Sequence, residues 1–217
     1  MYYSFISFLI FSLVFNYYSL LYLTKQTNWY LLHVICNFIV IIATFNDTIT
    51  CFANPLLVIE QGNTNNNFKS DGLGVAVSLH FFHIIRDYKT LTMIDWTHHL
   101  ISNFFLGILG LYYFHNSIFN CGLFFMCGLP GGIDYLLLFL YKIGKFKKGD
   151  EKKINVFLNN WIRLPGLLYN ISLMHISYST GYINVPSFIY YLSQFFTALN
   201  AIYFAQRVTL NFGSYLK

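Results

Sequence analysis

The chain has 217 residues, of which 56% are hydrophobic, 21% aromatic and only 10% charged, with a formal net charge of +5. An ordinary soluble domain is roughly 25% charged, so this composition argues against a soluble fold and, because it is so hydrophobic, against disorder. The apolar surface exceeds what one small core can bury, which predicts a protein embedded in a lipid bilayer. The four cysteines lie in apolar stretches without CxxC spacing, which argues against a disulfide scaffold.

Apolar windows separated by polar loops predict one domain, an all-α polytopic membrane helix bundle with seven transmembrane helices. The first window indicates a membrane span and not a removable signal peptide, because it has no basic leading segment and no cleavage site of small residues. The third is short and contains two histidines, which indicates burial among other helices. In chain order the predicted spans cover about 1–23, 29–52, 73–88, 90–114, 117–142, 155–179 and 187–210.

Basic residues are distributed unevenly between the two sides of this predicted bundle. Seven spans place loops 24–28, 86–90 and 142–155 and the C-terminus on one side. Of the 13 basic residues, only Lys69 lies in a loop on the other side, while Arg163 lies inside a span. Because cytoplasmic loops carry the excess of Lys and Arg, a cytoplasmic C-terminus is predicted. The net charge therefore needs no nucleic-acid partner; the lysines of 142–153 set the topology or contact lipid headgroups.

Charged and imidazole side chains inside the predicted spans gather at one depth. At about 1.5 Å of rise per residue, they lie roughly 6–14 Å from the cytoplasmic face. Such groups are costly in lipid, so they predict a polar pocket that opens toward the cytoplasm. The alternative is a set of satisfied hydrogen bonds between helices. The layer consists of His80, His83, Asp95, His98, His99, Asp134, Arg163 and Asn200.

Three local expectations follow from this layer. Asp95 and His99 are one helical turn apart, which predicts a hydrogen bond from the imidazole to the carboxylate. Asp134 and Arg163 are predicted to form a buried pair or to share a ligand, because neither is tolerable alone in a membrane. The segment Gly128-Leu129-Pro130-Gly131-Gly132 predicts a kink or a broken helix, which either lines a cavity or serves packing.

The chain resembles the TLC-domain family, which includes the ceramide synthases and several lipid-homeostasis proteins. The resemblance covers about residues 29–212 and rests on His98-His99, Asn160 to Arg163, Leu199 to Phe204 and Ile133 to Leu137. It implies a six-helix TLC-like core over 29–212, preceded by a transmembrane helix and loop in 1–28 and followed by a cytoplasmic tail in 213–217. It also implies a location in the endoplasmic reticulum.

The resemblance implies two functions. Some members bind, sense or redistribute lipids, which makes a lipid-handling protein the first hypothesis, with membrane lipids as its partners. Ceramide synthases transfer an acyl group from acyl-CoA to a sphingoid base and need their His pair. An acyltransferase of this type would use His98 and His99 as catalytic residues with Asp134 as a supporting acid. Its co-substrate would be acyl-CoA, whose phosphates Lys145, Lys147 and Lys148 could hold.

Two further hypotheses come from the residues themselves. Four histidines at one depth are typical of metal-dependent lipid oxidases, but the seven histidines of the chain are too few for such sites. No metal and no other cofactor are therefore expected, although a single-ion site is left open. A structural subunit of a membrane complex is the last hypothesis, and it gives the polar layer no purpose. The sequence predicts neither the lipid nor the oligomeric state.

Overall fold

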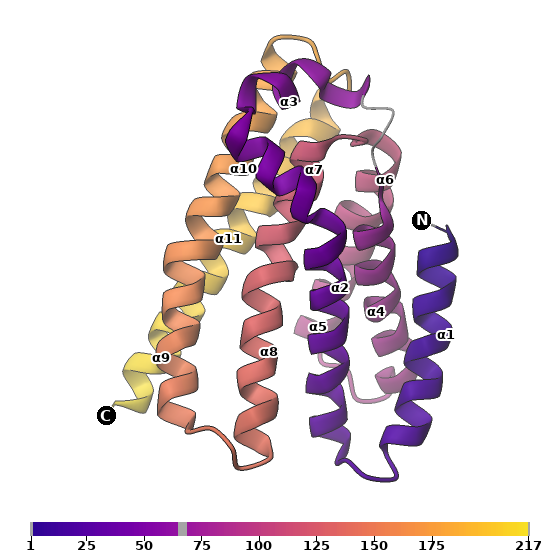
Figure 1. The fold of residues 1–217 in the computed structure, drawn as a ribbon, viewed down its shortest axis with the longest axis vertical. Coiled ribbons are helices and arrows are strands. Elements are labelled where there is room, and N and C mark those ends of the chain that lie inside the picture. The colour runs from indigo at the N-terminus through magenta and orange to yellow at the C-terminus, as the bar shows by residue number, and fades with distance from the viewer. Residues whose placement is uncertain (1, 65–68, 217) are drawn as a thin grey trace.

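The computed structural model describes residues 2–64 and 69–216, and over these residues the chain is an all-helical bundle without strands (Figure 1). Seven continuous helical rods reverse direction at successive loops, which confirms the predicted all-α fold and the approximate position of every predicted helix. The rods are α1 (Tyr2–Ser19), α2 (Lys25–Ala53), α4 (Asp71–Asp87), α5–η2–α6 (Met93–Leu100, Ile101–Ile108, Leu109–Tyr113), α7–η3–α8 (Ser117–Leu123, Phe124–Gly128, Leu129–Lys142), α9–η4–α10 (Lys148–Leu158, Asn159–Arg163, Leu164–Ser179) and α11 (Ser187–Tyr215). The short α3 (Pro55–Gln61) and η1 (Gly62–Thr64) follow α2.

Polar side chains define where several rods begin. The Thr24 hydroxyl accepts a hydrogen bond from the Thr27 amide at 3.2 Å at the start of α2. The Asn116 side chain accepts one from the Phe119 amide at 2.8 Å at the start of α7. These bonds satisfy amides that have no partner within the helix. Just after the C-terminal end of α8, Gly144 has a φ of +74°, a left-handed conformation that allows the chain to turn back toward α9.

Three of the rods contain a π-helical segment, and two of these segments end just before a proline. η3 precedes Pro130, and η4 precedes Pro165. Because proline has no amide hydrogen, the regular hydrogen bonding of an α-helix is interrupted at these positions. The rod around Gly128 is therefore continuous, with a π-helical segment in place of the predicted break. A Cβ atom added at Gly131 would lie 2.8 Å from Asn37 Nδ2, so this glycine allows close packing against α2.

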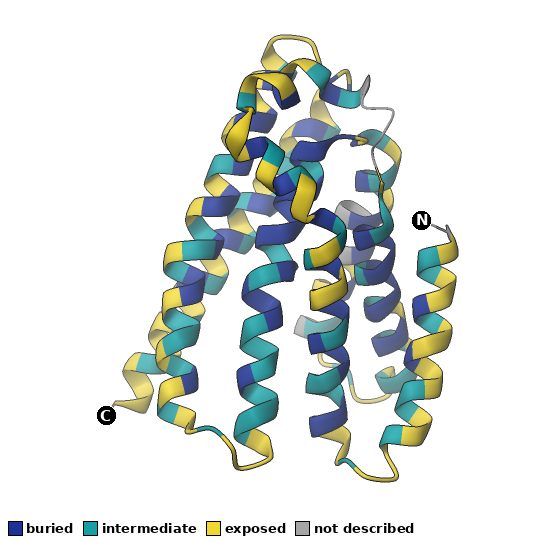
Figure 2. Ribbon diagram, viewed as in Figure 1, coloured by how far each residue is buried: buried dark blue, intermediate teal, exposed yellow. Residues whose placement is uncertain are grey.

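α2 is the central helix, since it packs against α8, α7 and α4 (Figures 1 and 2). One buried apolar cluster joins α1, α2 and α4 and includes Phe8, Leu32 and Phe82. A second joins α3, α7, α10 and α11 and includes Ile118 and Tyr190. The first and last rods therefore lie on different sides of a core that α2 and α7 share.

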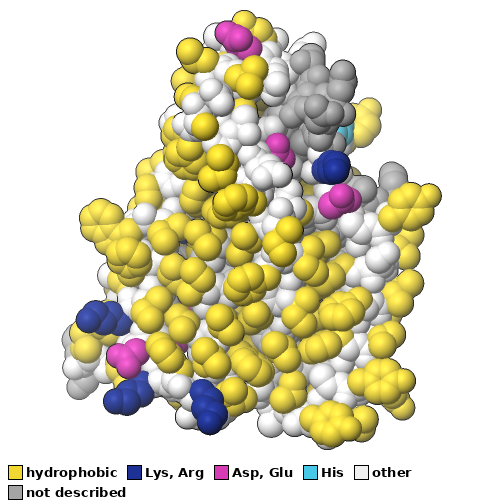
Figure 3. Space-filling view, in the orientation of Figure 1, with side chains coloured by type: hydrophobic (Ala, Val, Ile, Leu, Met, Phe, Trp, Pro, Cys, Tyr) yellow, Lys and Arg dark blue, Asp and Glu magenta, His cyan; other side chains and the backbone are white. Residues whose placement is uncertain are grey.

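Within the described ranges, two rods are long and apolar enough to cross a membrane, namely Lys25–Ala53 and Ser117–Lys142. Length and composition alone do not separate such a helix from the core helix of a soluble protein. Hydrophobic side chains also cover the middle of the face in Figure 3, with charged side chains toward its ends. Seven helical rods are thus observed, whereas seven membrane crossings stay a prediction.

Candidate functional site

Histidines from α4 and α5 face one another. His80 Nδ1 lies 3.0 Å from His99 Nδ1, a hydrogen-bond distance at which one ring donates and the other accepts. The His98 ring also faces His80, with ring centroids 5.2 Å apart. Ligating nitrogen atoms of His80, His98 and His99 all lie within 4.8 Å of one another. The two adjacent histidines of α5 therefore converge on a third histidine from α4. We call these three residues the histidine triad.

A capping box at the start of α5 positions this pair. The Thr92 hydroxyl accepts a hydrogen bond from the Asp95 amide, and Asp95 Oδ2 accepts one from the Thr92 amide at 2.9 Å. The same oxygen accepts a bond from the Thr92 hydroxyl at 2.7 Å. The predicted hydrogen bond between His99 and Asp95 is therefore wrong. Asp95 instead fixes the beginning of the helix that carries His98 and His99.

A row of stacked rings continues from the triad toward α2 and α8. The His83 ring stacks on Trp29, with centroids 3.2 Å apart, and lies 4.7 Å from His33. His33 in turn stacks on Tyr135 of α8 at 4.0 Å. His83 is only 2% exposed, and among the residues that the structure describes its Nε2 atom has no hydrogen-bond partner. The row thus buries an unsatisfied imidazole nitrogen beside the triad.

An open hollow of about 380 Å³ lies at the end of the bundle where α1 joins α2, and His99 is part of its lining. Its charged residues bind one another: Asp87 accepts from Lys25 at 2.6 Å and from Arg86 at 2.7 Å. The Arg86 guanidinium also lies over the Trp29 ring, 4.5 Å from its centroid. The full lining is Lys25, Gln26, Trp29, Arg86, Asp87, Thr90, Leu91, Asp95 and His99. His99, which is 5% exposed, is thus reached from the surface through a polar hollow.

Asp134 and Arg163 do not form the direct ion pair that was predicted. Within residues 2–64 and 69–216, Arg163 donates to Asn159 Oδ1 at 2.5 Å and lies over the Phe204 ring, whereas Asp134 Oδ1 has no hydrogen-bond partner. Arg163 Nε and Asn200 Oδ1 are also buried without a partner. The alternative, a shared ligand, stays a prediction. No hydrogen bond or ion pair in the described part of the chain joins Asp134 or Arg163 to the histidines, so the predicted layer divides into two groups.

The lysines that were expected to contact headgroups or CoA do not line this hollow. Lys145, Lys147 and Lys148 are exposed at and near the loop between α8 and α9. Lys148 lies 6.0 Å from the Tyr215 ring. The cations that share the hollow with His99 are Lys25 and Arg86 instead.

Three residues of this site, Trp29, His33 and Tyr135, are absent from the predicted layer. His33 is eight residues into α2, so it lies about 12 Å from the start of that helix, the same depth as the other histidines. His33 therefore belongs to the layer by its position along the helix alone. Trp29 and Tyr135 carry no comparable signal, since aromatic residues are frequent throughout this chain.

No protein-family model matches this sequence, no curated protein matches it, and no solved structure matches its fold. The function must therefore be argued from the geometry of the site.

Proposed function

We propose that this protein is a multi-pass membrane protein that binds a lipid and holds the lipid's polar group at the histidine triad. The observation that carries the proposal is the placement of His99, which is buried, is paired with His80, and borders a polar hollow that opens at one end of the bundle. A buried polar site next to a surface opening suits a ligand with a polar group and an apolar remainder. Such a ligand is a lipid.

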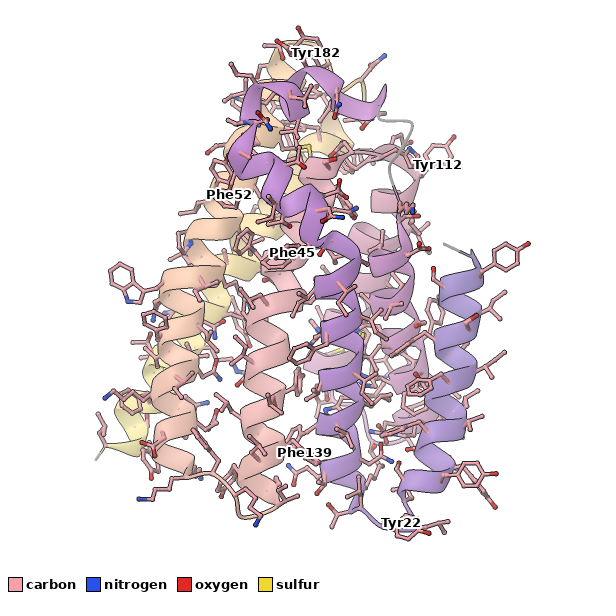
Figure 4. The ribbon with its side chains drawn as sticks, in the orientation of Figure 1. Tyr22, Phe45, Phe52, Tyr112, Phe139 and Tyr182 are labelled. Carbon is pink, nitrogen blue, oxygen red and sulfur yellow. The ribbon has the colours of Figure 1, made fainter. Side chains whose placement is uncertain are left out.

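The exterior of the bundle supports a membrane location. Large apolar side chains are exposed along the rods, among them Ile42 on α2, Ile202 on α11 and Ile10 on α1. Contiguous apolar surface of this kind is unusual for a soluble monomer. Tyrosines are exposed at both ends, as Tyr22 and Tyr182 illustrate (Figure 4), and tyrosine is enriched at membrane interfaces. We propose that all seven rods cross the bilayer.

The ends of the bundle differ in charge, which supports an orientation. The loops α1–α2, α4–α5 and α8–α9 lie together at one end (Figure 1), and that end carries the basic residues of these loops, from Lys25 to Lys153. By the positive-inside rule this end, the C-terminus and the hollow face the cytoplasm. The resemblance to TLC-domain proteins adds the endoplasmic reticulum as the proposed membrane.

An acyltransferase of the ceramide synthase type is the second candidate. The observation that favours it is that a histidine, His99, borders the same hollow as two cations, Lys25 and Arg86. A neutral imidazole can act as a base toward an amine or hydroxyl, and cations can hold the phosphates of a CoA thioester. Both cations already bind Asp87, however, so phosphate binding would have to compete with that carboxylate. Lipid binding needs no such exchange and is therefore the first proposal.

Native mass spectrometry of the purified full chain tests the proposal. We expect the wild-type protein to carry a co-purifying lipid and the variant His99→Ala to lose most of it. His175→Ala is the matched control, because His175 contacts the Tyr190 hydroxyl in a different part of the bundle, and it should retain the lipid. Equal lipid in wild type and in a folded His99→Ala protein would refute the proposal. Turnover of added acyl-CoA, lost in His99→Ala, would favour the second candidate instead.

A further inference from the structure

We propose that the histidine triad, His80, His98 and His99, binds a divalent transition-metal ion, with Zn²⁺ as the reference ion. This metal site uses the same three histidines as the proposed lipid site, but it does not depend on the lipid function, since the ion can bind whether or not a lipid is present. It is the single-ion site that the number of histidines left open, although no metal was expected.

The positions of the ligand atoms support the site. A tetrahedral zinc ion with Zn–N bonds of about 2.0–2.1 Å separates its nitrogen ligands by about 3.4 Å. His80 Nδ1 and His99 Nδ1 are 3.0 Å apart, and one ring nitrogen from each of the three residues lies within 4.8 Å of the other two. The largest separation therefore has to shrink by about 1.4 Å at most to reach the tetrahedral value.

A hydrogen bond between two imidazoles explains only part of the arrangement. It accounts for His80 and His99, but not for His98, whose ring also faces His80 although it is adjacent to His99 on the same helix. Consecutive residues of an α-helix point about 100° apart, so their convergence on a third ring is unusual. A metal ion accounts for all three rings at once.

The donor set favours particular metals. Three neutral imidazoles suit Zn²⁺, and also Cu and Ni ions, better than Mg²⁺ or Ca²⁺, which prefer oxygen ligands. Three protein ligands leave the fourth position of a tetrahedral zinc ion open. Because His99 borders the hollow, water or an anionic group can reach that position from the surface. The hollow also holds two carboxylates, Asp87 and Asp95, and two cations, Lys25 and Arg86, so its own side chains balance in charge.

Metal content decides the proposal. The full chain is purified in detergent, stripped with a chelator, loaded with Zn²⁺, washed, and analysed for zinc and protein. We expect about one zinc ion per chain and, with Co²⁺ in its place, the visible absorption of a nitrogen-ligated tetrahedral ion. Zinc should also raise the melting temperature, because an ion that binds only the folded state stabilises it.

Single substitutions locate the ion. We expect His80→Ala, His98→Ala and His99→Ala each to weaken Zn²⁺ binding at least about tenfold, as the loss of one of three ligands requires. His175→Ala is the matched control and should bind Zn²⁺ as the wild type does. His98→Gln is added because His98 is exposed, so its replacement leaves the core intact even if the other variants do not fold.

Three results would overturn the proposal. The first is a wild-type protein that holds less than about 0.1 zinc ion per chain after loading. The second is Zn²⁺ binding by His98→Gln that equals that of the wild type. The third is a loss of Zn²⁺ binding in His175→Ala as large as the loss in the triad variants. Lipid content is measured on the same samples. Lipid without zinc would reject the metal site and leave the lipid proposal standing, whereas zinc without lipid would do the reverse.

Discussion

Two carboxylates on neighbouring rods, Asp47 on α2 and Asp134 on α8, have opposite surroundings. Asp47 Oδ1 accepts a hydrogen bond from the Ser117 hydroxyl at 2.7 Å, and Oδ2 accepts one from Asn120 Nδ2 at 2.6 Å. Asp134 Oδ1 is buried without a partner among the residues that the structure describes. Both residues interrupt apolar helices, yet only one of them is satisfied by the fold itself.

The difference indicates which polar residues serve the fold and which are available to a ligand. A buried polar atom without a hydrogen bond costs free energy, so most native proteins contain few of them. Asp47 links α2 to α7 and thereby contributes to stability. Among the described residues, Asp134, Arg163, Asn200 and His83 each keep a buried polar atom without a hydrogen bond, as does Asn120 Oδ1; ligand binding would offset that cost where the ligand reaches the atom. The following predictions test this distinction.

The largest effect on stability is expected at Asp47. Asp47→Ala removes two hydrogen bonds to a charged group and should lower the free energy of unfolding by about 2–4 kcal/mol. Glu60→Ala is the control, because Glu60 is exposed on α3, and it should change stability by less than about 0.5 kcal/mol. Thermal unfolding in detergent measures both, and lipid retention should be unchanged in each. A loss at Asp47 no larger than the loss at Glu60 would show that the link between α2 and α7 is not structural.

The opposite result is expected at Asp134. Asp134→Asn keeps the shape of the side chain but removes a buried charge whose Oδ1 atom accepts no hydrogen bond among the described residues, so stability should stay within about 1 kcal/mol of the wild type or rise. Lipid retention, measured by native mass spectrometry, should nevertheless fall. Asp150→Asn, a substitution at an exposed site of α9, is the matched control for retention. A destabilisation as large as that of Asp47→Ala, with lipid retained, would assign Asp134 to the fold.

The sequence predicted the rods and the depth of the histidines because both depend only on distance along the chain. It did not predict which side chains meet, because that depends on direction around each helix axis. The π-helical segment η3 precedes Asp134, and the π-helical segment η4 ends at Arg163. A π-helical segment changes the rotation of the following residues relative to a regular helix, so depth along the chain does not determine which side chains meet. His80 and His99 have no such segment before them and do meet.

The hydrogen bond between Asp95 and His99 was predicted because the start of the fourth span was placed too early. The fourth span was predicted to begin near residue 90, which placed Asp95 inside the membrane helix beside His99. The helix begins at Met93, so Asp95 lies in its first turn and serves as a cap. The capping box ties Asp95 Oδ2 to Thr92, and among the described residues no hydrogen bond joins Asp95 to His99.

The smallest effect is expected at Glu151, a carboxylate of α9 outside the predicted spans. Burial raises the pKa of the Glu151 carboxyl. Three weaker effects lower this pKa in part: the charge of Lys152, a hydrogen bond from Asn155 and the charge of Lys148. An acid whose folded pKa is raised contributes stability that is fully present below its unfolded pKa and is lost as the pH rises through the folded pKa. Glu151→Gln keeps the neutral form at every pH. The variant should therefore match the wild type near pH 4 and become more stable than it toward pH 8, by less than about 1 kcal/mol after solvent screening.

Melting temperatures of both proteins across this pH range measure the difference, with Asp150→Asn as the control. Asp150 is the preceding residue and is exposed, so its difference from the wild type should change little with pH. Like Asp134, Glu151 would then be a carboxylate whose burial costs stability, but at the boundary of the bundle, where water offsets most of the cost. A difference that grows toward acid pH would instead mean that the ionised form of Glu151 is stabilised in the fold, as that of Asp47 is by its two donors.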